Sequence, residues 1–211
     1  LAAREAAERT SGLGVDLAIV KRIPQGGGLG GGSSDAASVL LALNRLWRLD
    51  LPRERLMTIG AALGADVPFF VFGSPALARG AGERLTAMTV PQRYATVVVP
   101  PVAVPTATVF AAPELTRNAP SAKMDVFSEA YGRNDLAAVA AARFPAVAEA
   151  LDALSRAAVG PGGARMSGSG SCVYALFDTR EAARAALAAM PAGTRGFVGR
   201  TLARHPLAGL A

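Results

Sequence analysis

A run of six glycines within seven positions, interrupted by Leu29, most constrains what this chain can fold into. It belongs to the stretch PQGGGLGGGSSDAA at residues 24–37. Apolar residues alternate along 15–23, which predicts a strand that ends before Pro24. A continuous apolar stripe along 34–49 predicts an amphipathic helix after the glycines. The glycines therefore form a short connection between two regular elements, which is not where a flexible linker is expected.

A glycine-rich turn between a strand and a helix start is suited to binding phosphate. Glycine allows backbone conformations and close approaches that a Cβ atom forbids. Several N–H groups can then converge on an anion, and the helix N-terminus adds a partial positive charge. Ser33, Ser34 and Asp35 are residue types that cap helix starts, and the two serines add hydroxyls. The sequence predicts an anion-binding loop here.

The two familiar nucleotide-binding motifs do not describe this loop. Gly26, Gly28 and Gly31 satisfy the spacing GxGxxG, but almost any run this rich in glycine does so. Asp50 lies near the expected acidic position of a dinucleotide fold, yet it follows a helix and not a second strand. The phosphate loop of NTPases requires a lysine where this chain has Gly32.

Composition excludes several classes of protein. Hydrophobic residues make up 51 % of the 211 residues, which excludes wholesale disorder. One cysteine, Cys172, and one histidine, His205, cannot supply a zinc site, and no metal ligand is assigned. No apolar run approaches the ~18 residues of a membrane helix, and residues 1–10 lack the apolar core of a signal peptide. We expect a cytoplasmic protein without a membrane partner.

The charge balance alone does not identify a partner. The formal net charge of +6 suits anionic partners such as nucleic acids or phosphorylated small molecules. The arginines are scattered singly, however, and no basic run is interleaved with aromatic residues. A solvated arginine-rich surface explains the charge equally well, and we expect no nucleic-acid partner. The sequence does not indicate an oligomeric state.

The pattern of elements restarts near residue 91, which predicts two domains, 1–90 and 91–211. The first half adds a helix over 52–63 and two short β-like pieces around Gly80 and Gly82. In the second half the order β, α, ββ, α, β predicts a ferredoxin-like arrangement. Its expected elements are a strand at 94–100, helices within 124–158, a strand–turn–strand over 162–177, a helix at 179–190 and a closing strand at 193–202.

The stretch PQGGGLGGGSSDAASVLLALNRLW resembles the ATP-binding motif of the GHMP small-molecule kinases. Further matches follow in order, so that the resemblance spans about residues 10–178: LGADVPFFVFG, ARGAGERL, VPTATVFAAPELTRN, NDLAAVAAARFPAV and RMSGSGSCVYALF. The longer form GLGGGSSDAA, followed by LNRLW, is similar to the branch that acts on a cytidine diphosphate-linked methylerythritol. The resemblance implies ATP-dependent phosphorylation of the 2-hydroxyl of that small molecule, with Mg²⁺, in isoprenoid biosynthesis.

The resemblance also implies a fold and a set of site residues. The fold is α/β (α+β), with an S5-like N-terminal domain, here without its first strands, and a ferredoxin-like C-terminal domain. Asp66 matches the catalytic aspartate, although without the resemblance it reads as a turn residue. Thr106, Gly168, Ser169 and Gly170 match positions on the substrate and phosphate side. The residues implied to surround the ATP phosphates are Pro24, Gly26, Gly27, Gly28, Leu29, Gly30, Gly31, Gly32, Ser33 and Ser34.

The sequence departs from the family at its start. Family members open with a segment carrying a lysine that partners the catalytic aspartate, and with residues that hold the cytosine ring. The given chain does not contain this segment, and Lys21 and Lys123 do not match that lysine. We therefore expect weak or absent kinase activity with nucleotide binding retained. The alternatives are another GHMP kinase, acting on homoserine, mevalonate or a sugar, and a nucleotide-binding form with little activity.

Overall fold

The computed structural model describes residues 12–119, 133–157 and 162–210. The chain packs into two compact units. The predicted helical residues 124–132 and Lys123 lie outside the described part, and the predicted domains 1–90 and 91–211 stay a prediction. The first unit comprises the described residues of Leu1–Arg22, Gly30–Thr89 and Ala203–Ala211, and the second comprises those of Ile23–Leu29 and Val90–Leu202.

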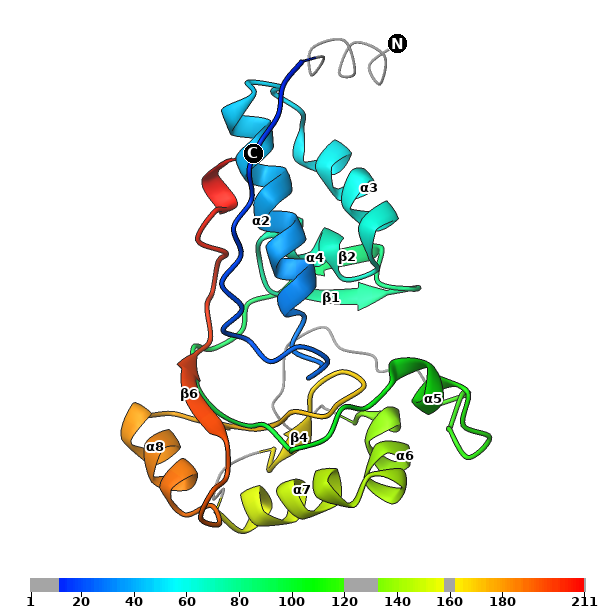
Figure 1. Ribbon diagram of the computed structural model, residues 1–211, viewed down its shortest axis with the longest axis vertical. Helices are drawn as coiled ribbons and strands as arrows, with labels where there is room; N and C mark the ends of the chain where they lie inside the picture. Colours follow the sequence, from blue (N-terminus) through cyan, green and yellow to red (C-terminus); the bar gives the residue numbers. More distant parts are fainter. Residues whose placement is uncertain (1–11, 120–132, 158–161, 211) are drawn as a thin grey trace. The chain divides into compact units, whose positions relative to one another are not determined.

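Helices dominate the first unit, with one short hairpin (Figure 1). Its apolar core includes Leu41, Leu56, Val67 and Val71. The Arg53 guanidinium donates to the carbonyls of Val71 and Ala208, so it ties three helices together. The elements are α2 (Gly31–Leu46), α3 (Arg53–Leu63), α4 (Val67–Phe72), the antiparallel strands β1 (Ala76–Arg79) and β2 (Arg84–Ala87), and the 3₁₀ turn η1 (Ala208–Leu210). The prediction of helix 52–63 and of two β pieces is confirmed.

Helix α2 begins earlier and ends earlier than the sequence predicts. Its N-cap is Gly30, whose positive φ of 67° allows the chain to enter the helix directly from the glycine run. The predicted side-chain cap by Ser33, Ser34 or Asp35 is wrong, because no side chain caps this helix and these residues lie inside the helix itself. At its other end, the buried Asn44 side chain bonds both backbone groups of Leu51 and fixes the turn that follows.

The predicted strand at 15–23 is wrong for the described structure. Residues 13–22 have no regular secondary structure, and the described sheets contain no strand that pairs with them. A strand is stable only where a neighbour satisfies its backbone groups and covers one face. Without such a neighbour the apolar side chains stay exposed, to 58 % at Leu17 and 55 % at Ile19. The segment thus has the alternating pattern of a strand, but among the described residues no neighbouring strand pairs with it.

The second unit is an antiparallel four-stranded sheet with strand order β4-β5-β3-β6 (Figure 1). This order and the β, α, ββ, α, β sequence confirm the ferredoxin-like prediction. Helices α7 and α8 pack on the sheet, and the buried Thr96 hydroxyl donates to Ala183 O of α8 at 2.6 Å. The elements are β3 (Tyr94–Val98), α5 (Thr106–Phe110), α6 (Asp135–Arg143), α7 (Pro145–Ala157), β4 (Arg165–Met166), β5 (Val173–Phe177), α8 (Arg180–Ala188) and β6 (Gly196–Arg200).

The two units together give the mixed α/β class that the sequence predicts. The second unit's core is contributed by β3, β5 and the helices, with Val98, Val139, Leu154 and Val173 among its buried members. No helix among the described residues is both long and apolar enough to cross a bilayer.

The exposed apolar residues of segment 13–23 give a first prediction. Replacing Leu17 and Ile19 together by lysine should lower the fluorescence of a bound hydrophobic dye, because it removes two exposed apolar side chains. The unfolding free energy should change by no more than about 0.5 kcal/mol, since neither side chain is buried. Leu63→Lys is the control, because this leucine is equally exposed, at 61 %, but stands on α3. An equal loss of dye signal in the control would contradict the prediction.

Candidate functional site

The first turn of α2 carries backbone donors that no side chain caps. Ser34 N donates to Gly30 O at 2.9 Å and is the first amide bonded in helical register. The preceding helical amides of Gly31, Gly32 and Ser33 have no carbonyl four residues back within the helix. Gly32 is exposed, and a Cβ atom placed on it would meet no atom of the chain within 4 Å. The helix start therefore offers uncovered N–H groups to an anion.

Helix α4 lies against this helix start. A Cβ atom on Gly30 would lie 2.9 Å from Cζ of Phe70, so the Phe70 ring occupies the space beside the N-cap of α2. Phe70 also stacks edge-to-face with Phe69 at a centroid distance of 5.3 Å. Asp66 is the N-cap residue of α4 and precedes Phe70 by about one turn. Asp66 thus begins the helix whose Phe70 ring packs beside the α2 start.

Asp66 is an exposed residue between two helices of the first unit. It lies between Gly64, where α3 ends, and Val67, whose N–H donates to Gly64 O at 3.1 Å. Among the described residues its carboxylate makes no hydrogen bond or ion pair, and it does not cap α4. The helix over 67–72 was not predicted from the sequence, although Pro68 in its first turn is a helix-start signal.

In the second unit, residues 24–29 pack against the turn that joins β4 to β5. A Cβ atom on Gly28, which has a φ of +73°, would overlap the Ser167 carbonyl. A Cβ on Gly27 would lie 2.5 Å from Sγ of Cys172, and one on Gly168 would lie 3.0 Å from Gly28 O. The two glycine-rich segments approach each other at backbone distance, which only glycine allows. The sequence predicted both segments as site residues, and this unit brings them together.

Hydrogen bonds fix this approach. Ser167 Oγ donates to Gly28 O at 2.7 Å, and Cys172 N donates to Gly27 O at 3.1 Å. Within the turn, Gly170 N donates to Ser167 O at 2.9 Å. Cys172 is fully buried, and burial raises the pKa of its thiol above the ordinary value. A buried, protonated thiol has a structural role here.

The predicted substrate-side residues Thr106 and Ser169 also meet. Their hydroxyl oxygens lie 2.7 Å apart, and Thr106 is the first residue of α5. Asn134 caps α6, because its side-chain oxygen accepts from Leu136 N at 3.0 Å. Its amide also donates to Gly168 O at 2.8 Å and to Met166 O at 3.0 Å. This second role of Asn134 has no signal in the sequence beyond its residue type.

One ion pair beside the helix start was not foreseen. Lys21 Nζ donates to Asp35 Oδ2, and Asp35 is the fifth residue of α2. The pair keeps a carboxylate near the uncovered amides neutralised. Lys21, for which the sequence predicts no catalytic role, has Asp35 as its partner in the structure.

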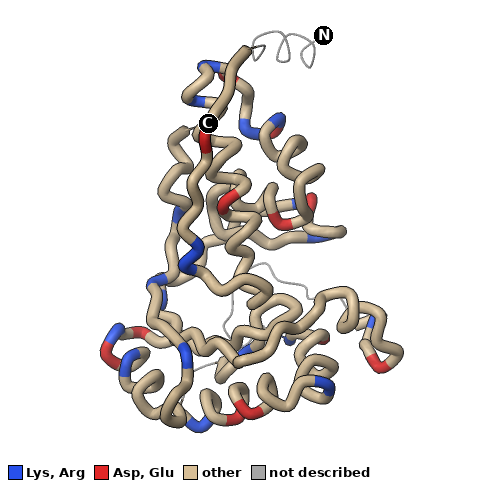
Figure 2. The backbone as a smooth tube through the Cα atoms, in the orientation of Figure 1, with Lys and Arg blue, Asp and Glu red and all other residues tan. Residues whose placement is uncertain are grey.

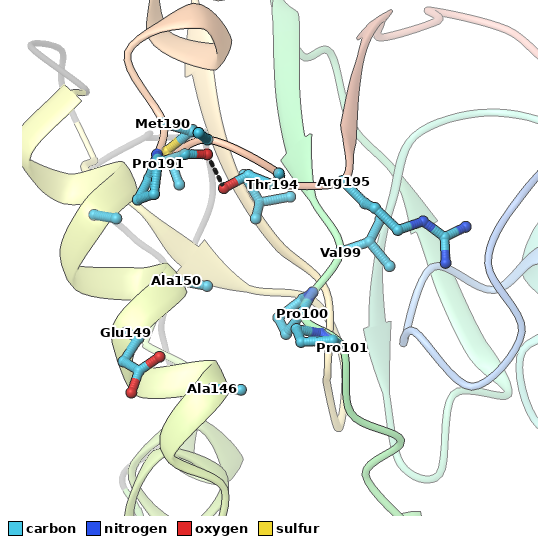
Figure 3. A pocket seen from close by; sticks show the side chains of 14 residues that line it. Val99, Pro100, Pro101, Ala146, Glu149, Ala150, Met190, Pro191, Thr194 and Arg195 are labelled. Carbon is cyan, nitrogen blue, oxygen red and sulfur yellow. Dashed lines mark hydrogen bonds between the residues drawn. The ribbon is translucent and has the colours of Figure 1, made fainter.

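An apolar cavity of about 310 Å³ in the second unit lies apart from these residues. Its lining comes from α7, from the end of β3 and from the segment before β6, and none of the predicted site residues lines it. In Figure 3, Pro100, Ala146 and Ala150 face the cavity, whereas the Arg195 guanidinium points away from it. Thr194 Oγ1 donates back to Pro191 O at 2.7 Å. The cavity offers no converging polar groups.

Two descriptions of protein domains match this chain. Residues 1–74 match the description "GHMP kinases N terminal domain", and residues 113–194 match "GHMP kinases C terminal". With the glycine-rich helix start and the ferredoxin-like second unit, the chain belongs to the GHMP kinase family.

Individual relatives carry the name of one particular kinase of the family. A protein of Thiobacillus denitrificans named 4-diphosphocytidyl-2-C-methyl-D-erythritol kinase is 55 % identical over 93 % of this chain and 69 % of that protein. One of the same name from Ralstonia pickettii is 51 % identical over 96 % of this chain and 71 % of its own. A crystal structure of 4-(cytidine 5'-diphospho)-2C-methyl-D-erythritol kinase, 37 % identical, matches with a TM-score of 0.77 over 94 % of this chain and 76 % of that one.

A more distant match indicates the fold alone. The crystal structure of homoserine kinase from Cytophaga hutchinsonii has a TM-score of 0.59 and 21 % identity. It covers 88 % of this chain and 69 % of that one.

The buried thiol provides a test of the contact between the two glycine segments. Cys172 in the native chain should react with iodoacetamide at least about tenfold slower than in the unfolded chain, because the thiol is buried and its pKa is raised. Ser167→Ala, which removes the bond to Gly28 O, should speed labelling. Thr194→Ala, whose hydroxyl bonds elsewhere in this unit, is the control. Fast native labelling would contradict the packing described.

Proposed function

We propose that this chain is an ATP-dependent kinase that phosphorylates the 2-hydroxyl of 4-diphosphocytidyl-2-C-methyl-D-erythritol, a step in isoprenoid-precursor biosynthesis. The observation that carries the proposal is the uncovered helix start at Gly31, in a chain whose relatives bear this enzyme's name at 46–55 % identity. The family's small-molecule substrates are phosphorylated with ATP as donor.

The phosphate-binding role falls to residues 24–34. Amides at the start of α2 supply N–H donors and the positive end of the helix dipole, which favour an anion. Ser33 and Ser34 add hydroxyl donors inside the same turn. Gly32 leaves this surface open, so that phosphate oxygens can approach the backbone. The carbonyls of Gly28 and Gly27 accept hydrogen bonds from Ser167 and Cys172, and these bonds fix the segment that leads into the helix.

Asp66 is proposed to accept the proton of the substrate hydroxyl. As the hydroxyl oxygen bonds to the γ-phosphorus, the bond from that phosphorus to the β–γ bridging oxygen breaks and ADP leaves. The proton passes to the Asp66 carboxylate, which has no competing partner among the described residues. A positioned base of this kind contributes about 10²- to 10⁴-fold in rate.

Thr106 and the turn Gly168–Gly170 are proposed to contact the substrate and phosphate side. The hydroxyls of Thr106 and Ser169 are hydrogen-bonded to each other, and the Asn134 amide donates a hydrogen bond to Gly168 O. Mg²⁺ would neutralise charge on the phosphates during transfer. The described residues contain no cluster of three or more His, Cys, Asp or Glu side chains that could hold a metal. Phosphate oxygens and water would therefore supply most of its ligands.

The function is tested with the chain itself and a panel of acceptors. Single-turnover transfer from ATP should yield a phosphorylated product with 4-diphosphocytidyl-methylerythritol but not with homoserine, mevalonate or galactose. Transfer to another acceptor would favour a different kinase of the family. ATP binding without transfer to any acceptor would favour a nucleotide-binding form.

Asp66→Asn tests the proposed base. It should lower kcat by about 100-fold or more, because an amide cannot accept the proton of the substrate hydroxyl. The affinity for ATP should stay nearly unchanged, because residue 66 is not proposed to contact a phosphate. Asp152→Asn is the matched control, since it makes the same change at an exposed position of α7 in the second unit. Full turnover in the Asp66 variant would exclude the assigned role.

Gly32→Ala separates folding from phosphate binding. Alanine should raise the unfolding free energy by up to about 1 kcal/mol, because Gly32 is helical and a methyl group there meets no protein atom. The same methyl group should weaken ATP binding by covering the helix start. Calorimetric unfolding and nucleotide titration measure the two effects. Gly14→Ala, also at an open position, should change neither strongly. Unchanged ATP affinity in Gly32→Ala would contradict the proposed contact.

A further inference from the structure

A cavity of about 240 Å³ lies at one end of the sheet in the second unit. Tyr94 opens β3 and Arg200 closes β6, and the two residues are direct register partners. Partners in an antiparallel pair present their side chains on the same face. Thr96 and Val98 follow Tyr94 on that face, and Thr96 bonds to α8, so the face is the one that α8 covers. The residues lining the cavity are Tyr94, Arg180, Val198, Gly199 and Arg200.

Helix α8 adds a second guanidinium to this cavity. Arg180 is the first residue of α8 and lines the cavity together with Arg200. Thr179 Oγ1 accepts from Ala182 N at 3.1 Å, so this first-turn amide is already capped by the protein. Side chains from two different elements, and not the helix end itself, therefore supply the positive charge. Figure 2 shows basic positions on both α8 and β6.

The positive charge in the cavity is not neutralised by a neighbouring carboxylate. No acidic residue lines it. Asp178, two residues before Arg180, pairs with Arg93 at 3.2 Å. Glu181 follows Arg180 and is exposed, and it adds a negative charge nearby without lining the cavity. Among the described residues, Arg180 and Arg200 have no hydrogen-bond or ion-pair partner.

The cavity is distinct from the turn at Gly168–Gly170. That turn precedes β5, whose first residue Val173 pairs with Val98 at the other end of β3. Tyr94 lies four residues away along the strand, which is about 13 Å. An anion bound beside Tyr94 therefore does not occupy the positions proposed for the kinase reaction in this unit.

We propose that this cavity binds the phosphoryl group of a small molecule. Two guanidinium groups supply planar, permanently charged donors that match phosphate oxygens, and the Tyr94 hydroxyl is a further donor. The cavity is smaller than the ~300 Å³ at which sites for whole drug-sized ligands begin. It therefore suits a terminal phosphate or inorganic phosphate, with the rest of a phosphomonoester left outside.

The test is a titration of the whole chain with inorganic phosphate and, separately, with glycerol 3-phosphate, followed by amide NMR at constant salt and saturating ATP. Saturable shifts are expected at Tyr94 and Gly199. In Arg180→Gln/Arg200→Gln the dissociation constant should rise at least about tenfold. The control Arg184→Gln/Arg195→Gln removes the same charge from α8 and from the segment before β6, and should bind nearly as the parent does.

Each outcome is decisive. Binding of both ligands shows that the cavity recognises the phosphoryl group, and binding of inorganic phosphate alone restricts the site to the free ion. Shifts confined to residues 26–34 and 167–172 would place the anion at the proposed kinase site and overturn the inference. An equal loss in the control variant would mean diffuse attraction to a basic surface. Because kinase activity is not the readout, failure here leaves the proposed function standing, and the reverse also holds.

Discussion

The second unit depends on one close backbone approach, between Gly28 and the turn at Ser167–Gly168. At this distance no side chain fits, and two hydrogen bonds from Ser167 and Cys172 hold the segments together. A loop of glycines is entropically costly to order, since glycine loses more backbone freedom than other residues. The contact with a sheet turn is what makes this loop a defined structure. A defined loop can present its backbone groups to a ligand without further ordering.

In the first unit, a second glycine has the corresponding role. Gly30 takes a left-handed conformation that starts α2 directly, and its missing side chain makes room for Phe70. Phe70 stands about one turn after Asp66, so the ring that packs beside the helix start belongs to the short helix that Asp66 begins. The helix then needs no polar cap, and its first amides remain uncovered. A serine or aspartate cap would satisfy one of these amides and reduce its availability to an anion.

The errors of prediction have identifiable physical causes. The alternation along 15–23 is a real strand pattern, but strand formation depends on a partner that local sequence does not specify. A helix start capped by Ser33, Ser34 or Asp35 is statistically preferred, but α2 begins earlier, after Gly30, whose positive φ allows this start without a side-chain cap. The elements 52–63 and 162–177 were predicted well because their patterns end in strong breakers or turns. The pairings of Thr106 with Ser169, and of Asn134 with Gly168, join residues too distant in sequence for local pattern to reveal.

The sequence by itself determined the class of the protein and the location of the glycine-rich loop for which we propose phosphate binding. Both follow from local chemistry, because glycine content and helix-start position are properties of a short stretch. Tertiary structure alone decided how the loop is held, which amides remain uncovered and which side chains meet. It also decided that Arg180 and Arg200 share one cavity, since strand register and helix placement bring them together. Such groupings arise from packing between distant segments, which no local pattern encodes.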